Sequence, residues 1–170
     1  GHGRGERPRR SRRCARSGPE RSRALSAVVR ALGLDLGQRR IGVAVCDDMG
    51  GVATPYETIQ RVGDQVVEHA RILELLEETG AEVLVVGVPY SLDGSIGPAA
   101  TSILAEIRGI EKKLRAAATP VAVETQDERF TTVTASDALR AGGVNDRRQR
   151  QRIDASAAAV LLQAYLDGPH

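Results

Sequence analysis

Three acidic sites in this 170-residue chain lie where predicted secondary-structure elements begin or end. Asp35 interrupts an apolar run, where a carboxylate is costly unless it is paired or bound to a cation. Asp127 and Glu128 follow a short apolar strand, and Asp154 lies near the start of the last predicted helix. Carboxylates that converge from separate elements make a site for Mg²⁺ or Mn²⁺, which prefer oxygen ligands. Such ions activate water and stabilise the leaving oxygen in phosphodiester cleavage.

Each of these acids also has an ordinary structural interpretation. Asp35 can cap the turn that follows its strand. Asp154 can satisfy the dipole of a helix as a first-turn acid, and Asp127 with Glu128 can belong to a solvated turn. The local sequence leaves these alternatives open, so the metal-site interpretation depends on whether the fold brings the acids together.

Basic residues accompany the acids. The run from Arg147 to Arg152 is either a solvated helix start or a phosphate-binding patch, and beside Asp154 it would place cations where an anionic backbone must lie. The loop of residues 93–95 precedes a helix and could hold a phosphate, although an ordinary capped turn is favoured there. The candidate substrate-binding residues are Arg40, Arg129, Arg147, Arg148, Arg150 and Arg152.

A β-hairpin must position Asp35. Two apolar runs, 31–36 and 41–45, are joined by a short segment that begins at Gly37, which is typical of a tight turn. Small residues at 155–159 would let the last helix lie close to the sheet, so that the Asp154 carboxylate could reach the end of the first strand.

Hydrophobic spacing predicts the other elements. They are an edge strand at about 52–59, which contains Pro55, a helix over 63–79, a buried strand over 82–88, a long helix from Ile96 to Leu114, a short strand over 121–124, a helix from Thr131 or Thr132 to Ala141, and a last helix over about 152–166. The early hairpin is antiparallel, whereas strand–helix–strand crossovers imply parallel pairing. The expected fold is therefore α/β, with a mixed sheet and helices on both faces.

The same spacing predicts the inward faces of three helices. These faces are Val62, Val66, Ala70, Leu73 and Leu76 in the first, Ile96, Ala100, Ile103, Ile107, Ile110 and Leu114 in the second, and Ile153, Ala157, Val160 and Ala164 in the last.

Charge divides the chain into two parts. Residues 1–24 hold nine Arg and two Glu, and because the whole chain has 24 Lys and Arg and 22 Asp and Glu, the remainder has 15 basic and 20 acidic residues. We expect residues 1–26 to be a disordered Arg-rich arm and residues 27–170 to form one domain. Such arms either contact nucleic acid or are inert.

Composition argues against several functional classes. With one Phe, three Tyr and no Trp, base stacking on an aromatic platform is not expected. Cys14 and Cys46 form neither a disulfide framework nor a zinc-site spacing, although a disulfide between chains is a hypothesis worth testing. No apolar run approaches about 20 residues and no secretory signal is present, so we expect a cytoplasmic protein with no membrane span.

Four sequence blocks together resemble the YqgF (RuvX-like) family of pre-16S rRNA nucleases and Holliday-junction-resolvase-like proteins, which have the RNase H fold. The blocks cover nearly all of residues 31–167 in the right order. They are Gly33–Gly37 with Arg40–Ala44, Val86–Pro89 with Asp93–Ser95, Asp127–Arg129 with Thr131 and Thr132, and Ile153–Asp154 with Ala157, Ala158 and Leu161–Leu166.

The resemblance implies a mixed five-stranded sheet with helices around it, and a metal-binding and catalytic triad of Asp35, Glu128 and Asp154. In related junction resolvases the second acid lies on the fourth strand. The corresponding strand here has no internal acid, so Glu128 takes that role, with Asp127 as the alternative. The family often has serine where this chain has Cys46, which raises a redox possibility.

Three functions follow from the resemblance. The first is a hydrolase, a nuclease dependent on Mg²⁺ or Mn²⁺, that processes the 5′ end of pre-16S rRNA in ribosome biogenesis. The second is a Holliday junction resolvase that cuts a DNA four-way junction as a homodimer, since two strands require two active sites. The third is a nucleic-acid-binding assembly factor without catalysis. An actin-like ATPase is set aside, because its paired nucleotide-binding halves need a much longer chain.

Overall fold

A computed structural model describes residues 30–46, 51–130 and 147–168, with the backbone alone at 130 and 147–153. The predicted arm, the start of the domain at 27, the predicted helix at 131–141 and Cys14 lie outside the described residues.

The first two strands form the predicted hairpin. Strand β1 (Ala31–Leu36) pairs antiparallel with β2 (Arg40–Cys46), and both strands are buried on both faces for most of their length. Backbone pairing satisfies the polar groups that this burial removes from water. The hairpin thus forms the middle of the sheet and carries Asp35 there.

The sheet is mixed and has the strand order β3-β2-β1-β4-β5. Strand β3 (Ala53–Gln60) pairs antiparallel with β2 and lies at an edge, as Pro55 predicted. Strands β4 (Val83–Val88) and β5 (Ala122–Asp127) run parallel to β1. The predicted combination of an antiparallel hairpin and parallel crossovers is therefore confirmed.

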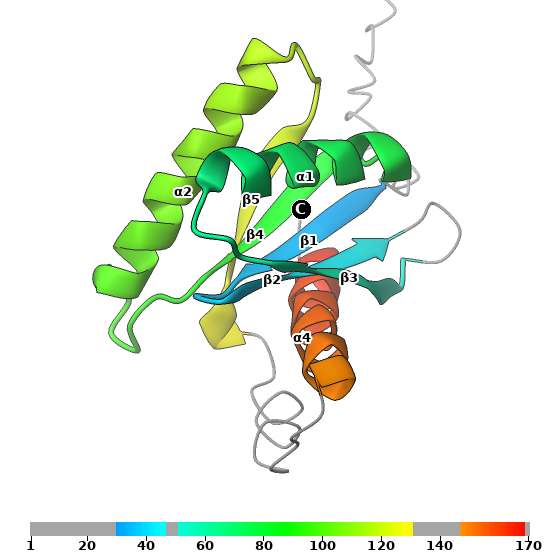
Figure 1. Cartoon of the computed structure of the whole chain (residues 1–170). Helices are drawn as coiled ribbons and strands as arrows, with labels where there is room; N and C mark the ends of the chain where they lie inside the picture. Colours follow the sequence, from blue (N-terminus) through cyan, green and yellow to red (C-terminus); the bar gives the residue numbers. More distant parts are fainter. Residues whose placement is uncertain (1–29, 47–50, 131–146, 169–170) are drawn as a thin grey trace, which may run out of the picture.

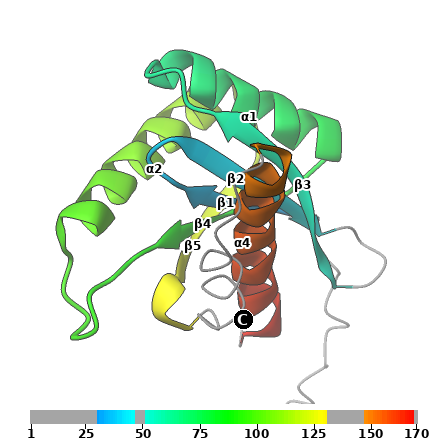
Figure 2. The ribbon, with the colours of Figure 1, turned by 60° about the horizontal axis from the view of Figure 1, so that its bottom comes forward.

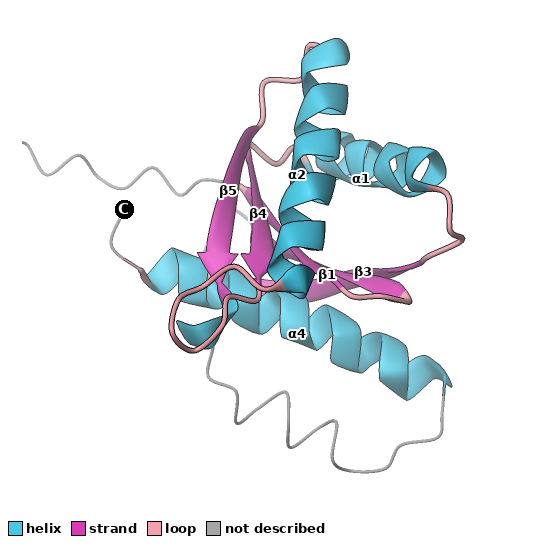
Figure 3. Cartoon of the chain, turned by 90° about the vertical axis from the view of Figure 1, so that its left-hand side faces the viewer, coloured by secondary structure: helices cyan, strands magenta, loops and turns pink. Residues whose placement is uncertain are grey.

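Helices cover the two faces unequally. Helices α1 (Gln65–Thr79) and α2 (Pro98–Ala116) lie on one face, and α4 (Arg147–Asp167) crosses the other (Figures 1 and 2). The side view in Figure 3 shows the sheet between these two layers. The prediction of helices on both faces is confirmed.

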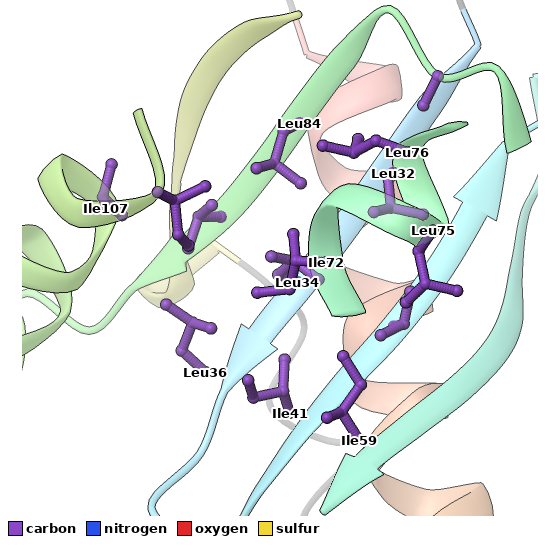
Figure 4. Packing of buried hydrophobic residues seen from close by; sticks show 14 of the residues in the cluster. Leu32, Leu34, Leu36, Ile41, Ile59, Ile72, Leu75, Leu76, Leu84 and Ile107 are labelled. Carbon is purple, nitrogen blue, oxygen red and sulfur yellow. The ribbon is translucent and has the colours of Figure 1, made fainter. Parts of the chain in front are cut away.

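Two apolar clusters hold the layers together. The larger one joins β1, β2 and β4 to α1 and α2; Figure 4 shows Leu32 and Leu34 against Ile72 and Leu75. The smaller cluster lies under α4 and uses small residues, among them Ala158. Small side chains bring the α4 axis close to the sheet, as predicted.

The inward faces of two helices differ from the prediction. In α1, Val66 and Ala70 are exposed, and the buried residues include Glu68 and His69. The reason is a polar contact: the guanidinium of Arg61 draws the Glu68 carboxylate inward.

In α4 the error is a shift of one residue: Ala158 and Leu161 are buried, whereas Ala157 and Val160 are only half-buried. This helix also begins at Arg147, so the basic run forms its first turns. The predicted face of α2 is confirmed except at Ile96, which precedes the helix and is exposed.

Cys46 ends β2, and its side chain is buried. No helix in the described part of the chain is long and apolar enough to cross a membrane.

Candidate active site

Asp35 lies between two glycines at the centre of the sheet. Its direct partner across the β1–β2 ladder is Gly42. On the other side Leu34 pairs with Val86, so the next residue of β4, Gly87, comes beside Asp35. Side chains alternate along a strand, and Ala31 belongs to the cluster under α4, so Asp35 is on the α4 face of the sheet.

Gly42 allows α4 to come very close to Asp35. A Cβ atom at Gly42 would lie 2.2 Å from the backbone oxygen of Asp154. Only a residue without a side chain fits there. The helix backbone therefore rests on β2 at Asp154, one strand away from Asp35.

Gly87 makes the equivalent space on the other side. A Cβ atom at Gly87 would overlap Cδ1 of Leu161 in α4 and would lie 2.6 Å from Oε1 of Glu128. Glu128 begins the short helix η1 (Glu128–Phe130), which directly follows β5. Its carboxylate folds back over β4, so acids from β1, η1 and α4 surround one area of the sheet.

The three carboxylates are not gathered as ready metal ligands. Among the side chains that the structure describes, no three His, Cys, Asp or Glu residues are grouped closely enough to hold a metal ion. Asp154 is turned to Arg40 instead, with 2.9 Å between Asp154 Oδ2 and Arg40 Nη1. The fold thus brings the elements of the predicted triad together and leaves their side chains apart.

Asp127 has a different environment from Glu128. Arg129 donates to both oxygens of the Asp127 carboxylate, with a shortest distance of 2.6 Å from Nη2 to Oδ2. The hydrogen bond from the Arg129 side chain holds the pKa of Asp127 below its usual value. Asp127 is therefore committed to this ion pair, whereas Glu128 Oε1 lies over Gly87.

The predicted substrate-binding arginines have different positions. Arg40 pairs with Asp154 and Arg129 with Asp127, so both guanidinium groups contact acids of the protein. Arg147, Arg148, Arg150 and Arg152 lie in the first turns of α4, and their side chains are outside the described part of the structure.

Arg61 is a residue that sequence reasoning missed. Its Nε donates to the Gly37 carbonyl oxygen at 2.7 Å, which holds the turn between Asp35 and Arg40. Its other nitrogens donate to Glu68 and Glu106, both nearly buried. No local pattern could have indicated this, because the partners come from separate helices.

An open hollow of about 670 Å³ lies beside that turn. None of the candidate acids lines it. Its lining residues are Gln38, Arg39, Gln60, Arg61, Gly63, Gln65 and Glu68.

Residues 29–168 match the family described as "RuvX: Holliday junction resolvase". The chain belongs to the RuvX family. The match covers every described element from β1 to α4, so the acids of β1, η1 and α4 all fall within it.

Relatives of this RuvX-family chain carry one common name. A protein of Streptomyces avermitilis named "Putative pre-16S rRNA nuclease" is 44% identical over 138 residues, which cover 81% of this chain and 85% of the relative. A protein of Picosynechococcus sp. with the same name is 42% identical over 139 residues, covering 82% and 92% of the two chains.

Solved structures with a similar fold are junction resolvases. RuvC of T. thermophilus in complex with a Holliday junction substrate has a TM-score of 0.52 at 17% identity, covering 81% of this chain and 93% of RuvC. The yeast mitochondrial resolvase Ydc2 has a TM-score of 0.50 at 10% identity, covering 82% and 78% of the two chains. These likenesses establish the RNase H-like fold of the RuvX-family chain.

The donor set suits a divalent ion. All three candidate ligands are carboxylates, the oxygen donors that Mg²⁺ and Mn²⁺ prefer. Asp154 Oδ2 is buried and accepts no hydrogen bond from any described residue, because its contact with Arg40 lacks hydrogen-bond geometry. The Arg40 guanidinium already places a positive charge beside this oxygen, so a divalent ion would compete with Arg40 for the carboxylate.

Proposed function

We propose that this RuvX-family chain is a divalent-metal-dependent nuclease that hydrolyses phosphodiester bonds in structured nucleic acid. The observation that carries the proposal is the position of Asp35 between Gly42 and Gly87, with Asp154 and Glu128 admitted on either side. Glycine in the interior of a strand weakens the sheet, because it has no side chain to pack. The positions of Gly42 and Gly87 let α4 pack closely on the sheet and leave room for the Glu128 side chain over Gly87, so that the elements carrying the three acids come together.

The proposed roles follow from the side chains. Asp35, Glu128 and Asp154 would hold Mg²⁺ or Mn²⁺, which supplies an activated water and stabilises the leaving oxygen. Asp35 lies on a central strand of the sheet, so its position would fix where the ion is held. Arg40 neutralises Asp154 while no cation is bound. Water adds to phosphorus, the P–O bond to the leaving oxygen breaks, and that oxygen takes a proton.

We assign the precursor of 16S rRNA as the substrate, cut in processing its 5′ end during ribosome biogenesis in the cytoplasm. The support is the common name of the relatives, which are up to 44% identical over most of their length. The Arg-rich first turns of α4 lie just ahead of Asp154 in the chain and would contact phosphates. Phosphate contacts of this kind position a nucleic acid without reading its sequence.

A DNA four-way junction is the second candidate substrate. It is favoured by the description of the matched family and by the fold of RuvC. Cutting both strands of a junction requires two active sites, so this alternative also predicts a homodimer.

A direct test uses the purified full chain with two substrates, a precursor 16S rRNA fragment and a four-way DNA junction. Each is incubated with Mg²⁺, with Mn²⁺ or with a chelator. Metal-dependent cleavage of the RNA supports the proposal, and cleavage of the junction alone supports the resolvase. Binding without cleavage under every condition would establish a non-catalytic assembly factor and overturn the nuclease.

A further inference from the structure

We propose that Asp127 and Arg129 form a positioning pair, in which Arg129 fastens the loop after β4 to the turn after β5 and so fixes the Glu128 carboxylate over Gly87. The inference rests on the proposed nuclease function. It gives Arg129 a different role from the phosphate contact expected from the sequence, because neither member of the pair touches substrate.

The first set of contacts joins Asp127 and Arg129 to each other. Asp127 Oδ1 accepts from the backbone N–H of Arg129 at 2.9 Å, which fixes the backbone on both sides of Glu128. The Arg129 side chain donates to the same carboxylate through Nε and Nη2. Two parallel donors give the ion pair a defined geometry.

The second set of contacts reaches a distant loop. Arg129 Nη1 donates to the backbone oxygens of Ser91 at 3.2 Å and Leu92 at 3.4 Å. The guanidinium carbon also lies 6.0 Å from the centre of the Tyr90 ring, at the outer limit of a cation–π contact. Arg129 thereby joins segments that are more than 35 residues apart in sequence.

The loop that receives these bonds has its own internal order. Ser91 N–H donates to the Ser95 carbonyl oxygen at 3.0 Å, and Gly94 N–H donates to the Ser91 oxygen at 2.7 Å. Asp93 caps Ser95 N–H at 2.9 Å. Because these hydrogen bonds tie Ser91 to Gly94 and Ser95, the contacts of Arg129 with Ser91 and Leu92 also restrain the rest of this loop.

The donors of Arg129 are used within the protein. All three guanidinium nitrogens donate to Asp127 or to the loop carbonyls. A phosphate would meet a guanidinium group whose three nitrogens are already engaged, so the geometry points to positioning rather than substrate binding.

Glu128 lies between the two partners in sequence and above Gly87 in space. Its Oε1 occupies the space that a Cβ of residue 87 would need. Because residues 127 and 129 are held, the backbone of Glu128 between them is held as well, which sets the direction in which its side chain leaves the chain. Residues that orient metal ligands in this way typically change metal affinity or activity by roughly 10- to 100-fold when they are replaced.

The experiment compares Arg129→Gln, Asp127→Asn, the double variant and Arg129→Lys in the full chain, with Arg108→Gln as the control. Arg108 is an exposed arginine in the middle of α2. Three quantities are measured: hydrogen exchange of residues 90–97, Mn²⁺ affinity by calorimetry, and kcat and KM for the cleaved substrate.

We expect Arg129→Gln and Asp127→Asn to lose exchange protection at 90–97 and to lower Mn²⁺ affinity and kcat by roughly 10-fold or more. The double variant should be little worse than either, because one unit is broken. Arg129→Lys should lose less protection, Mn²⁺ affinity and kcat than Arg129→Gln, because it keeps the positive charge. KM should change little in all of these variants.

The inference would be overturned if Arg129→Gln raised KM alone, with normal hydrogen exchange and normal Mn²⁺ affinity, and if Asp127→Asn behaved like the wild type. Arg129 would then be a substrate contact. If the wild type neither cleaves nor binds Mn²⁺, the proposed function is wrong, and the hydrogen-exchange data alone then test whether Asp127 and Arg129 hold the loop. Unchanged protection of residues 90–97 in both single variants would reject the positioning pair, and lost protection would support it.

Discussion

Asp35 is the residue on which the proposed chemistry depends. It is half-buried on a central strand, between glycines and near two further acids. In the proposed site its negative charge is what would hold a divalent ion, together with the charges of Glu128 and Asp154.

The replacement Asp35→Asn should abolish metal-dependent cleavage, because Asn keeps the shape and loses the charge. Stability should stay the same or rise, since repulsion between acids falls. Mn²⁺ should raise the melting temperature of the wild type by mass action and raise it less in the variant. Thermal melts with and without Mn²⁺ measure this. Glu77→Gln, at an exposed position on α1, is the control; wild-type cleavage by Asp35→Asn would contradict the assignment.

At the scale of elements, α4 is the part that completes the site. It contacts β1, β2 and β3, and its backbone meets β2 at Gly42. The first turns of α4 carry the basic run, and the next turn carries Asp154. Displacing this one helix would move an acid and a set of cations together.

The variants Gly42→Ala and Gly87→Ala should differ. At Gly42 a methyl group meets the backbone oxygen of Asp154, so α4 must shift, at a cost of about 1–3 kcal/mol or more. At Gly87 it meets the side chains of Leu161 and Glu128, which can move. We therefore expect Gly42→Ala to lose stability and activity, and Gly87→Ala to lose mainly activity.

Denaturant unfolding and cleavage rates of the same preparations measure this difference. Gly97→Ala is the control, because its methyl group would only touch Ser91 Oγ at 3.4 Å. Equal losses of stability at 42 and 87 would show that the close approach of α4 does not set the cost.

The sequence predicted the elements better than their faces. Apolar runs located β1, β2 and β4, because strands buried on both faces are continuously apolar in sequence. The face of α1 was wrong, because Glu68 and His69 are buried by polar partners that spacing cannot show. Asp35, Glu128 and Asp154 were singled out by their positions at the ends of elements and by the family resemblance, and their role stays a prediction. The contacts of Arg129 were not predicted, since they join segments far apart in sequence.

At the scale of the whole molecule, a buried polar cluster joins α1, α2 and the end of β3. Arg61 pairs with Glu68 and Glu106, and His69 Nε2 lies 3.6 Å from Glu106 Oε1 without a hydrogen bond among the described residues. Breaking one member of such a cluster leaves a buried charge unpaired. The cluster therefore links the helical layer to the turn that follows Asp35.

This cluster should make stability depend on pH. Burial lowers the pKa of His69 in the folded state, with Lys113 acting in the same direction and Glu106 and Glu68 opposing it. The unfolded chain then binds a proton near pH 6.5 that the folded chain does not. The contribution of His69 to the free energy of unfolding should be fully present above that pH. Below it the free energy of unfolding should fall, by at most about 1.4 kcal/mol per pH unit.

Urea unfolding at several pH values between 5 and 8 measures the slope. His69→Gln should flatten the slope in this range, since the titrating group is gone. An identical slope in wild type and variant would assign the dependence to other groups.

The Arg-rich arm is a second property of the whole molecule. Removing residues 1–26, which lie outside the described residues, deletes nine arginines. Non-specific RNA binding should weaken and its salt dependence should flatten, because fewer counterions are released. Binding titrations at several salt concentrations measure the slope, and the cleavage rate at saturating substrate should be unchanged. An unaltered slope would show that the arm does not contact nucleic acid.

The two glycines beside Asp35 also limit how this protein can be made more heat-resistant. Replacing glycine with alanine is a common route to higher melting temperature, because it reduces the freedom of the unfolded chain. At Gly42 and Gly87 the space for the methyl group is already taken by Asp154 and Glu128. An engineer who ranks substitutions by backbone entropy would select two positions where the usual gain is unattainable. Thermostable variants will have to keep this pair of glycines and find their gains elsewhere.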